Sequence, residues 1–254
     1  MNFIEVSLIL FFVGFGAGIV DAVAGGGGLL TFPALLLVGL PPAQALATNK
    51  IQALASVASS AYRFSKLGQG DKSTILMKVI ASAIGGAMGA LAVAFMNPSV
   101  LGKAVPFILI CVAVFFLFSP NIVASRTQAL IKENTFALVA AFPIGFYDGF
   151  FGPGTGSLYA AAFVILLGRN LHSATADTKV LNTTGSLIAA FVFLFGGMIS
   201  WSAAIAMSAG GILGAQLGAH LAVKWGTQFI RVALVFVSIA LALRLLVQQG
   251  LIPL

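Results

Sequence analysis

The sequence predicts an all-α polytopic membrane protein made of two homologous repeats, and three observations support that class. The 254-residue chain is 60% hydrophobic and only 7% charged, with a mean hydropathy of +1.09, which is too apolar for an ordinary soluble domain. Apolar runs near the roughly 20 residues of a spanning helix recur along the chain, whereas strands of a membrane barrel are about half as long and alternate. One pattern of charges and glycines also occurs twice.

The chain opens with what we expect to be an interrupted hairpin. Residues 1–20 are apolar enough for a first helix, and Asp21 follows at its end. The glycine run 25–28 should break that helix, because glycine accepts conformations that other residues resist. The second apolar piece, residues 29–40, is too short to span the bilayer alone. The tip of the hairpin therefore carries Asp21 and the glycines.

Three further helices are expected in this half, over residues 45–62, 75–96 and 101–118. Two prolines, at positions 41 and 42, end the hairpin because proline cannot continue a helix and restricts the residue before it. The loop between the first two of these helices starts the strongest positive cluster of the chain, and the positive-inside rule places it in the cytoplasm. Its basic residues are Arg63, Lys66, Lys72 and, just beyond, Lys78.

The second half repeats this layout. The segment AFPIGFYDGFFGPGTGSLYAAAF matches VGFGAGIVDAVAGGGGLLTFPAL, with Asp148 in the place of Asp21, and further on Lys179 takes the place of Lys50. Each repeat is thus predicted to hold an interrupted Gly-rich hairpin plus three transmembrane helices. The predicted divisions are a first repeat, a cytoplasmic linker and a second repeat, over residues 1–118, 119–133 and 134–254.

The two repeats are predicted to be inverted. A hairpin returns to its own side of the membrane, so three more helices leave the two ends of a repeat on opposite sides. Positive-inside counting favours inversion over a parallel arrangement. Inversion keeps four basic residues inside, Arg126, Lys132, Arg169 and Lys224, and leaves Lys103 as the main positive loop residue outside. The sequence leaves open whether the hairpins cross the membrane fully or re-enter.

Asp21 and Asp148 are the first candidates for function. A carboxylate at membrane depth is expensive and indicates a functional site by default. Two roles fit both residues. Either carboxylate could carry a transported proton, or it could fix the break by accepting hydrogen bonds from exposed helix-end N–H groups.

The two glycine breaks are candidates for the substrate site, which we expect near the membrane midplane between the two interrupted hairpins. Each break leaves a helix N-terminus inside the protein, where bare N–H groups and the positive end of the helix dipole attract anions. Paired interrupted segments in two halves are the best sequence indication of a transporter's binding site. The alternative is that these glycines only permit close helix crossing. The candidates are Gly26, Gly27, Gly28, Gly154, Thr155 and Gly156.

Lys50 and Lys179 complete the predicted site. Both are flanked by hydrogen-bonding side chains, and two lysines that face two helix N-termini would suit a small oxyanion better than a cation or a sugar. The alternative for each is a lysine that reaches to the membrane interface. Asp177 could pair with Lys179 and make the halves unequal. The substrate-binding candidates are Asn49, Lys50, Gln52, Thr178, Lys179 and Asn182.

Other chemistries find no support in the sequence. No His or Cys spacing indicates a metal site or a catalytic nucleophile, so we predict no metal, no cofactor and no catalytic residue. Cys111 is the single cysteine, which excludes a disulfide within one chain. The net charge of +7 comes from Lys and Arg at segment ends, as topology determinants would be, so no nucleic-acid partner is expected.

The paired motifs resemble a known family. The segments GIVDAVAGGGGLLTFPALL and GLPPAQALATNK, followed by GFYDGFFGPGTG and ATADTKVLN, are similar to those of the TauE/SafE sulfite-exporter family, also called TSUP. The resemblance covers nearly the whole chain. It implies a multi-pass protein of a bacterial inner membrane that moves small sulfur-containing or organic anions, such as sulfite, sulfonates or sulfoacetate.

The sequence therefore predicts a secondary transporter, not an enzyme, that works by alternating access. Export is the favoured direction, although the sequence does not fix it. The expected partners are a small anionic substrate and the lipid bilayer, while proton coupling and a homodimer stay open. An anion channel would also use paired half-helices around a pore. A membrane-embedded enzyme is the weaker alternative, because it would need a nucleophile, an acid–base pair or a metal.

Overall fold

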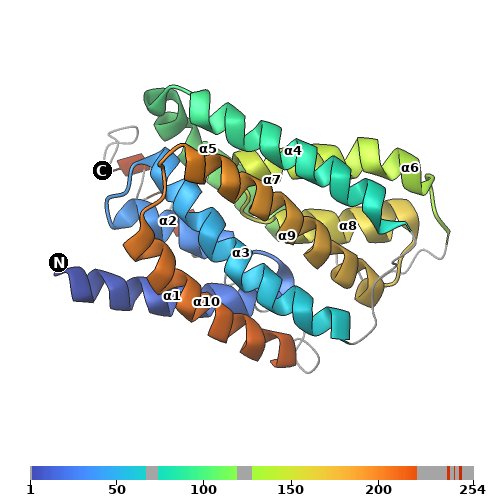
Figure 1. Cartoon of the computed structure of the whole chain (residues 1–254), viewed down its shortest axis with the longest axis horizontal. Coiled ribbons are helices and arrows are strands. Elements are labelled where there is room, and N and C mark those ends of the chain that lie inside the picture. Colours follow the sequence, from blue (N-terminus) through green and yellow to red (C-terminus); the bar gives the residue numbers. More distant parts are fainter. Residues whose placement is uncertain are drawn as a thin grey trace.

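The computed structural model describes residues 2–66, 74–118 and 128–221, together with residues 239, 240, 243, 246 and 247. In these ranges all regular secondary structure is helical, which confirms the predicted all-α class. The helices form an elongated bundle (Figure 1). Four of the described helical segments are long and apolar enough to cross a membrane, as a polytopic membrane protein requires: Phe3–Val23, Ile75–Phe95, Ser173–Phe195 and Trp201–His220.

The first half contains the expected interrupted hairpin and three further helices. Gly25, with a left-handed φ of 71°, ends the first helix, and the second begins at Gly28 after a short break. The third helix begins at Pro42 instead of residue 45, because proline in a first turn gives up only an N–H that has no helical partner. The helices are α1 (Phe3–Ala24), α2 (Gly28–Leu37), α3 (Pro42–Lys66), α4 (Ile75–Phe95) and α5 (Pro98–Phe118).

The second half has a break at the same place. A short helix, a π-helical turn and a further helix continue into one another, and glycines 152 and 154 with φ of 95° and 87° then interrupt the chain. Of the predicted linker, residues 119–127 lie outside the described part, as do most residues after position 221. The elements are α6 (Glu133–Phe136), η1 (Ala137–Ala141), α7 (Phe142–Phe150), α8 (Thr155–Leu167), α9 (Leu171–Phe195) and α10 (Trp201–Leu221).

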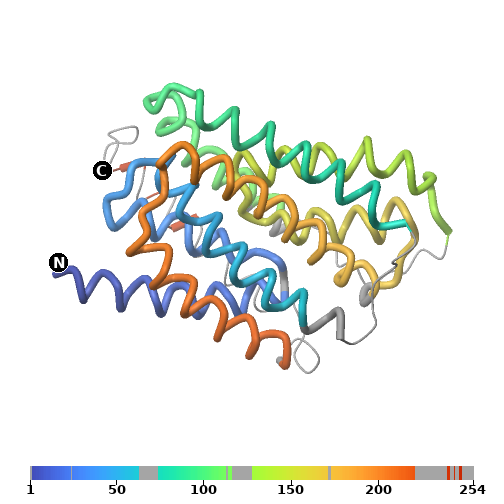
Figure 2. The backbone as a smooth tube through the Cα atoms, viewed as in Figure 1, coloured from blue at the N-terminus to red at the C-terminus, as the bar shows by residue number. Residues whose placement is uncertain are grey.

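Corresponding helices of the two halves run in opposite directions. In Figure 2, α1, α3 and α10 run from left to right, whereas α7, α9 and α4 run from right to left. The halves also exchange partners, because α1 packs along α10 and α7 packs along α4. Between these pairs, α3 contacts α9 and α10, and α9 contacts α3 and α4. The centre of the bundle is thus built by both halves together.

Within each exchanged pair, the backbones of the two helices approach one another closely. A Cβ added at Gly18 of α1 would lie 2.2 Å from the carbonyl oxygen of Gly211 on α10. One added at Gly89 of α4 would lie 2.1 Å from the carbonyl oxygen of Phe146 on α7. Small residues at helix contacts allow this approach in membranes. The two pairs therefore form tight layers that flank α3 and α9.

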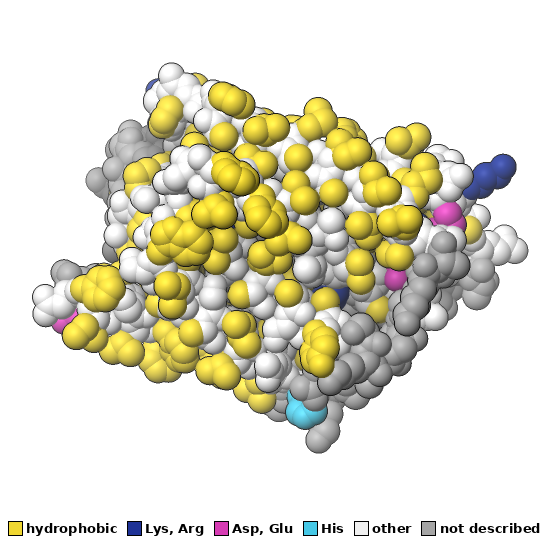
Figure 3. Space-filling model, in the orientation of Figure 1, with side chains coloured by type: hydrophobic (Ala, Val, Ile, Leu, Met, Phe, Trp, Pro, Cys, Tyr) yellow, Lys and Arg dark blue, Asp and Glu magenta, His cyan; other side chains and the backbone are white. Residues whose placement is uncertain are grey.

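The surface suits a lipid environment along the flank of the bundle. Figure 3 shows hydrophobic side chains spread over this flank and charged side chains mainly at its ends. Exposed apolar residues include Phe12, Ile84 and Leu213. The start of α4, α6 and the α8–α9 connection lie at one end, while the α4–α5 connection lies at the end that holds the N-terminus (Figure 1). Lys72, Arg126 and Lys224 lie outside the described residues.

Candidate functional site

The two glycine breaks meet inside the protein. A Cβ added at Gly25 would lie 2.8 Å from the carbonyl carbon of Gly156, and one at Gly28 would lie 3.0 Å from the Cα of Pro153. The glycines therefore do permit a close backbone crossing, as one of the two interpretations expected. The crossing also brings the starts of α2 and α8 close together, which is the region between the two breaks where the sequence predicted one shared site.

Lys50 of α3 forms a buried ion pair with Asp148 of α7. The Lys50 Nζ lies 2.9 Å from the Asp148 Oδ1, and the two side chains are 1% and 2% exposed. Thr155 donates a hydrogen bond of 3.0 Å to the same carboxylate oxygen, and the Ser186 hydroxyl lies 3.4 Å from the other one. Gly185 leaves room for this carboxylate, because an added Cβ would lie 2.6 Å from Oδ2. The pair crosses from the first half to the second.

Lys179 of α9 makes the reciprocal contact with Asp21 of α1. The Lys179 Nζ donates a hydrogen bond of 2.6 Å to the backbone oxygen of Asp21 and lies 3.5 Å from its carboxylate oxygen Oδ2. Asp21 belongs to the last turn of α1, where the helix dipole favours a cation. This pair is looser than the first, since the Asp21 side chain is 13% exposed. The two halves are therefore similar but not equivalent at the site.

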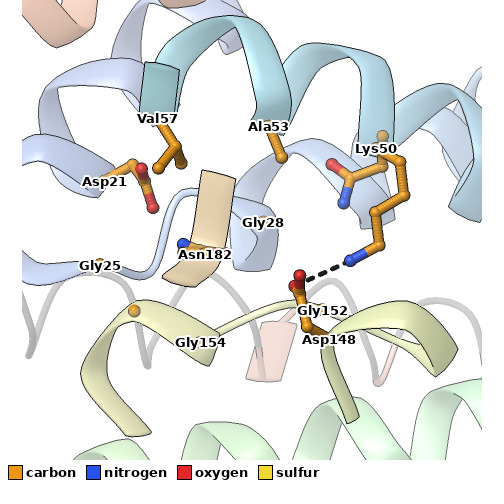
Figure 4. A pocket seen from close by; sticks show the side chains of 12 residues that line it. Asp21, Gly25, Gly28, Lys50, Ala53, Val57, Asp148, Gly152, Gly154 and Asn182 are labelled. Carbon is orange, nitrogen blue, oxygen red and sulfur yellow. Dashed lines mark hydrogen bonds and ion pairs between the residues drawn. The ribbon is translucent and has the colours of Figure 1, made fainter. Parts of the chain in front are cut away.

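A small internal cavity lies between the two pairs. Its volume is about 20 Å³, which is room for about one water molecule. Figure 4 shows Lys50 and Asp148 pointing toward one another, with Asp21 and Asn182 also at the cavity. The lining residues are Asp21, Gly25, Gly28, Asn49, Lys50, Ala53, Val57, Asp148, Gly152, Gly154, Gly156 and Asn182.

Most of the residues that were predicted for the site lie at or beside this cavity. Asn49 lines it and accepts a hydrogen bond from Thr31 of α2. Thr155 does not line it but holds Asp148. The others do not line the cavity: Gly26 and Gly27 lie in the first break, and Asp177, Thr178 and Lys179 are buried on α9.

Gln52 lies away from the cavity. Its side-chain nitrogen donates a 2.8 Å hydrogen bond to Ser56 on the same helix. The same nitrogen would be 2.7 Å from a Cβ added at Gly211 of α10. Gln52 therefore faces the contact between α3 and α10 in this structure.

Four lining residues were not among the predicted site residues: Gly25, Gly152, Ala53 and Val57. The helical spacing of three and seven residues from Lys50 could have indicated Ala53 and Val57, since such positions share one face. Gly152 lies directly against the lysine, because a Cβ added there would be 2.4 Å from the Lys50 Nζ. Only the fold reveals that contact, because Lys50 and Gly152 belong to different halves.

Known proteins match this chain over nearly its full length. The family model described as "Sulfite exporter TauE/SafE" matches residues 10–245. A "probable membrane transporter protein" of Haemophilus influenzae is 40% identical over 97% of both chains. The "probable membrane transporter protein YfcA" of Escherichia coli strain K12 is 40% identical over 94% of this chain and 88% of its own. No solved structure matches the chain at the level of statistical significance that these relatives reach. The chain belongs to the TauE/SafE sulfite exporter family of membrane transporters.

Proposed function

We propose that the protein is a secondary transporter that moves small anions across a bacterial inner membrane through the cavity between the two breaks. Sulfite, sulfonates and sulfoacetate are the candidate substrates, with export as the favoured direction. The observation that carries the proposal is the pair of Lys–Asp contacts, each formed between the halves, where two interrupted helices meet. Interrupted helices of this kind form the substrate sites of many transporters.

The site offers an anion three kinds of partner. Gly28 and Gly156, in the first turns of α2 and α8, line the cavity and offer their backbone N–H groups at the positive ends of two helix dipoles. Neighbouring N–H groups of these turns already donate to carbonyl oxygens of the breaks. Lys50 supplies a charge, and Asn49 and Asn182 supply amide groups. An oxyanion that replaced Asp148 beside Lys50 would use all three. Asp148 thus holds the lysine when no substrate is bound.

Proton coupling follows from the charge of the site. Lys50 and Lys179 are already balanced by Asp148 and Asp21, and adding an anion to a buried and formally neutral site is costly. Protonation of Asp148 would free Lys50 for the anion and keep the total charge unchanged. Anion and proton would then move together in the same direction, and the proton would sit on the carboxylate that faces Lys50, Thr155 and Ser186.

The opposite helix directions in the two halves support the proposal of inverted repeats that work by alternating access. The 20 Å³ cavity is too small for an oxyanion, so the site must widen toward one side of the membrane at a time. This small volume suits the closed state of a carrier better than the pore of a channel. The helices of the exchanged pairs α1–α10 and α4–α7 pack closely along one another, so we expect each pair to tilt as a unit around α3 and α9.

Flux measurements on protein in liposomes test this proposal. Methanesulfonate is a suitable probe because it stays a monoanion over a wide pH range, so any proton movement reports on the protein. For a carrier, we expect uptake that saturates with concentration and that rises when the same anion is present inside. Uptake that rises linearly without saturation would contradict a carrier. The anion proposal would fail if a panel of sulfite, sulfonates and carboxylates gave no flux.

A further inference from the structure

A second cluster of charges lies at the end of the bundle that holds α6, away from the cavity. Glu133 at the start of α6 contacts two cations at once. Its Oε2 lies 2.6 Å from the Lys78 Nζ of α4, and its Oε1 lies 2.6 Å from an Arg169 guanidinium nitrogen. Arg169 belongs to the α8–α9 connection. The cluster therefore joins the first half to the second through one carboxylate that contacts two cations.

The three members differ in their freedom to move. The Lys78 side chain is fully buried at 0% exposure, lies 5.7 Å from the centre of the Phe163 ring and donates a 3.0 Å hydrogen bond to Thr74. A buried cation needs an anionic partner at all times. Glu133, by contrast, is one-third exposed at 33% and lines an open cavity of about 880 Å³. The Oε2 atom that contacts Lys78 is itself buried, but other atoms of the Glu133 side chain reach the surface. Of the two residues, Glu133 is therefore the one that an anion from this cavity could displace.

The positions in the other half that correspond to Lys78 and Arg169 carry no charge. The offset of 125 that relates Gly85 to Gly210 relates Lys78 to Ala203 (203 − 78 = 125). The offset of 129 that relates Lys50 to Lys179 relates Leu40 to Arg169 (169 − 40 = 129). Ala203 and Leu40 both pack into the apolar core. At these two positions the helices pack without charged side chains, so the charges of Lys78 and Arg169 serve something besides packing.

We propose that Lys78 and Arg169 form a second site for a small oxyanion, which Glu133 occupies as a tethered carboxylate. Each carboxylate oxygen contacts one cation, which is the two-point contact that sulfite, a sulfonate or a free carboxylate would also make. An anion that passes this end of the bundle takes the place of Glu133, and Lys78 keeps a counterion throughout. The identity of the cargo as an oxyanion rests on the proposed function.

Thermal unfolding of a Glu133→Ala variant in detergent tests this site with formate and sulfate as probes. The variant leaves Lys78 without its carboxylate, so its Tm should fall by roughly 5–10 °C. Formate or sulfate should restore half or more of the loss, whereas chloride at equal ionic strength should not. Glu5→Ala is the matched control, because Glu5 lies at the opposite end and bonds only its own helix start. Its Tm should show no extra response to formate.

Two further measurements keep the test decisive. In Glu133→Ala/Arg169→Ala, the extra stabilisation by formate should be lost, and its persistence would overturn the site. If Glu133→Ala does not fold, Glu133→Gln keeps the side-chain volume and should show the same anion response. Equal anion-induced shifts in wild type and both Glu133 variants would show an ion cluster with only a structural role. Failure of the proposed function is distinguishable, because it appears as absent flux in wild-type protein.

Discussion

The Lys50–Asp148 pair is the residue-scale feature on which the account depends. Both side chains are buried, and the aspartate keeps two hydroxyl partners besides the lysine. Each residue could be recognised from the sequence as an unusual charge in an apolar segment. Their pairing could not, because they lie 98 positions apart in different halves. The burial of Lys78 could not be recognised either. The sequence placed Lys78 in a cytoplasmic positive cluster, whereas the fold buries it completely.

Removing Lys50 alone should destabilise the protein. In Lys50→Ala, Asp148 becomes an unpaired buried charge, and breaking a buried pair in this way costs about 3–5 kcal/mol. In Lys50→Ala/Asp148→Asn, the neutral amide needs no cation, so most of the stability should return while transport stays lost. Thermal unfolding in detergent measures both effects. A double variant as unstable as the single one would show that the pair does not account for the loss.

Asp148→Asn tests proton coupling directly. The amide imitates a protonated carboxylate, so the variant should move methanesulfonate without the accompanying proton. A pH-sensitive dye inside liposomes measures this. Wild-type uptake should acidify the interior, and uptake by the variant should not. Acidification by the variant at the wild-type ratio of protons to anions would exclude Asp148 as the proton site.

Gly152 offers a test with a closely matched control. Gly152 and Gly39 both have left-handed backbones, with φ of 95° and 92°, so alanine should cost about 1–2 kcal/mol at either position. Only at Gly152 would the new Cβ contact Lys50, at 2.4 Å, whereas Gly39 has nothing within 4 Å. Gly152→Ala should therefore lose anion flux and Gly39→Ala should keep it. Equal flux in the two variants would show that contact with Lys50 is unimportant.

At the scale of the elements, glycine patterns predicted the breaks well and the helix partners poorly. The run at residues 25–28 ends α1 as expected, because a left-handed residue such as Gly25 cannot continue a helix. The repeat then located the second break near Gly152. The packing of α1 on α10 and of α7 on α4 could not be read from the sequence, since small residues show that a helix packs closely but not against which partner.

Alanine substitutions at two glycines of α1 distinguish the effect of close packing on stability from the effect of helix propensity. A Cβ at Gly18 would lie 2.2 Å from the Gly211 carbonyl oxygen on α10, whereas Gly16 has nothing within 4 Å. Gly18→Ala should lower stability by about 1–3 kcal/mol through overpacking. Gly16→Ala should be neutral or gain up to about 1 kcal/mol from helix propensity. Thermal unfolding of both variants measures this, and a Gly18→Ala protein as stable as Gly16→Ala would contradict the described α1–α10 contact.

The whole molecule has opposed helix directions in its two halves and different chemistry at its two ends. Lys78, Arg169 and Glu133 form a charged cluster at one end, while Leu40 and Ala203 occupy the corresponding positions in the apolar core. The sequence predicted the class and two repeats, because composition and a repeated motif are visible in one dimension. It also predicted a site between the two breaks, but it did not reveal the small volume of the cavity or residues such as Gly152 that line it, because these depend on contacts between distant segments.

Cysteine labelling can determine which side of the membrane each end of the helix bundle faces. Cys111 is replaced first because it is exposed. Lys103→Cys, at the start of α5, and Lys132→Cys, next to α6, are exposed positions at opposite ends of the bundle. A membrane-impermeant thiol reagent should label residue 103 on intact cells and residue 132 only after lysis, because the positive-inside rule predicts that the basic end faces the cytoplasm. Labelling of both on intact cells would contradict the proposed topology.

Anion flux through lysine variants in liposomes is the most direct test of the central claim. The comparison requires wild type, Lys50→Ala/Asp148→Asn, Lys179→Ala and Lys103→Ala, each shown to be folded by thermal unfolding. We expect saturable flux in wild type and in Lys103→Ala. In the other two variants, we expect flux at low anion concentration to fall about tenfold to a hundredfold, as the loss of one charge-assisted hydrogen bond implies. Wild-type rates in both of those variants would contradict the claim that the anion binds between the two breaks.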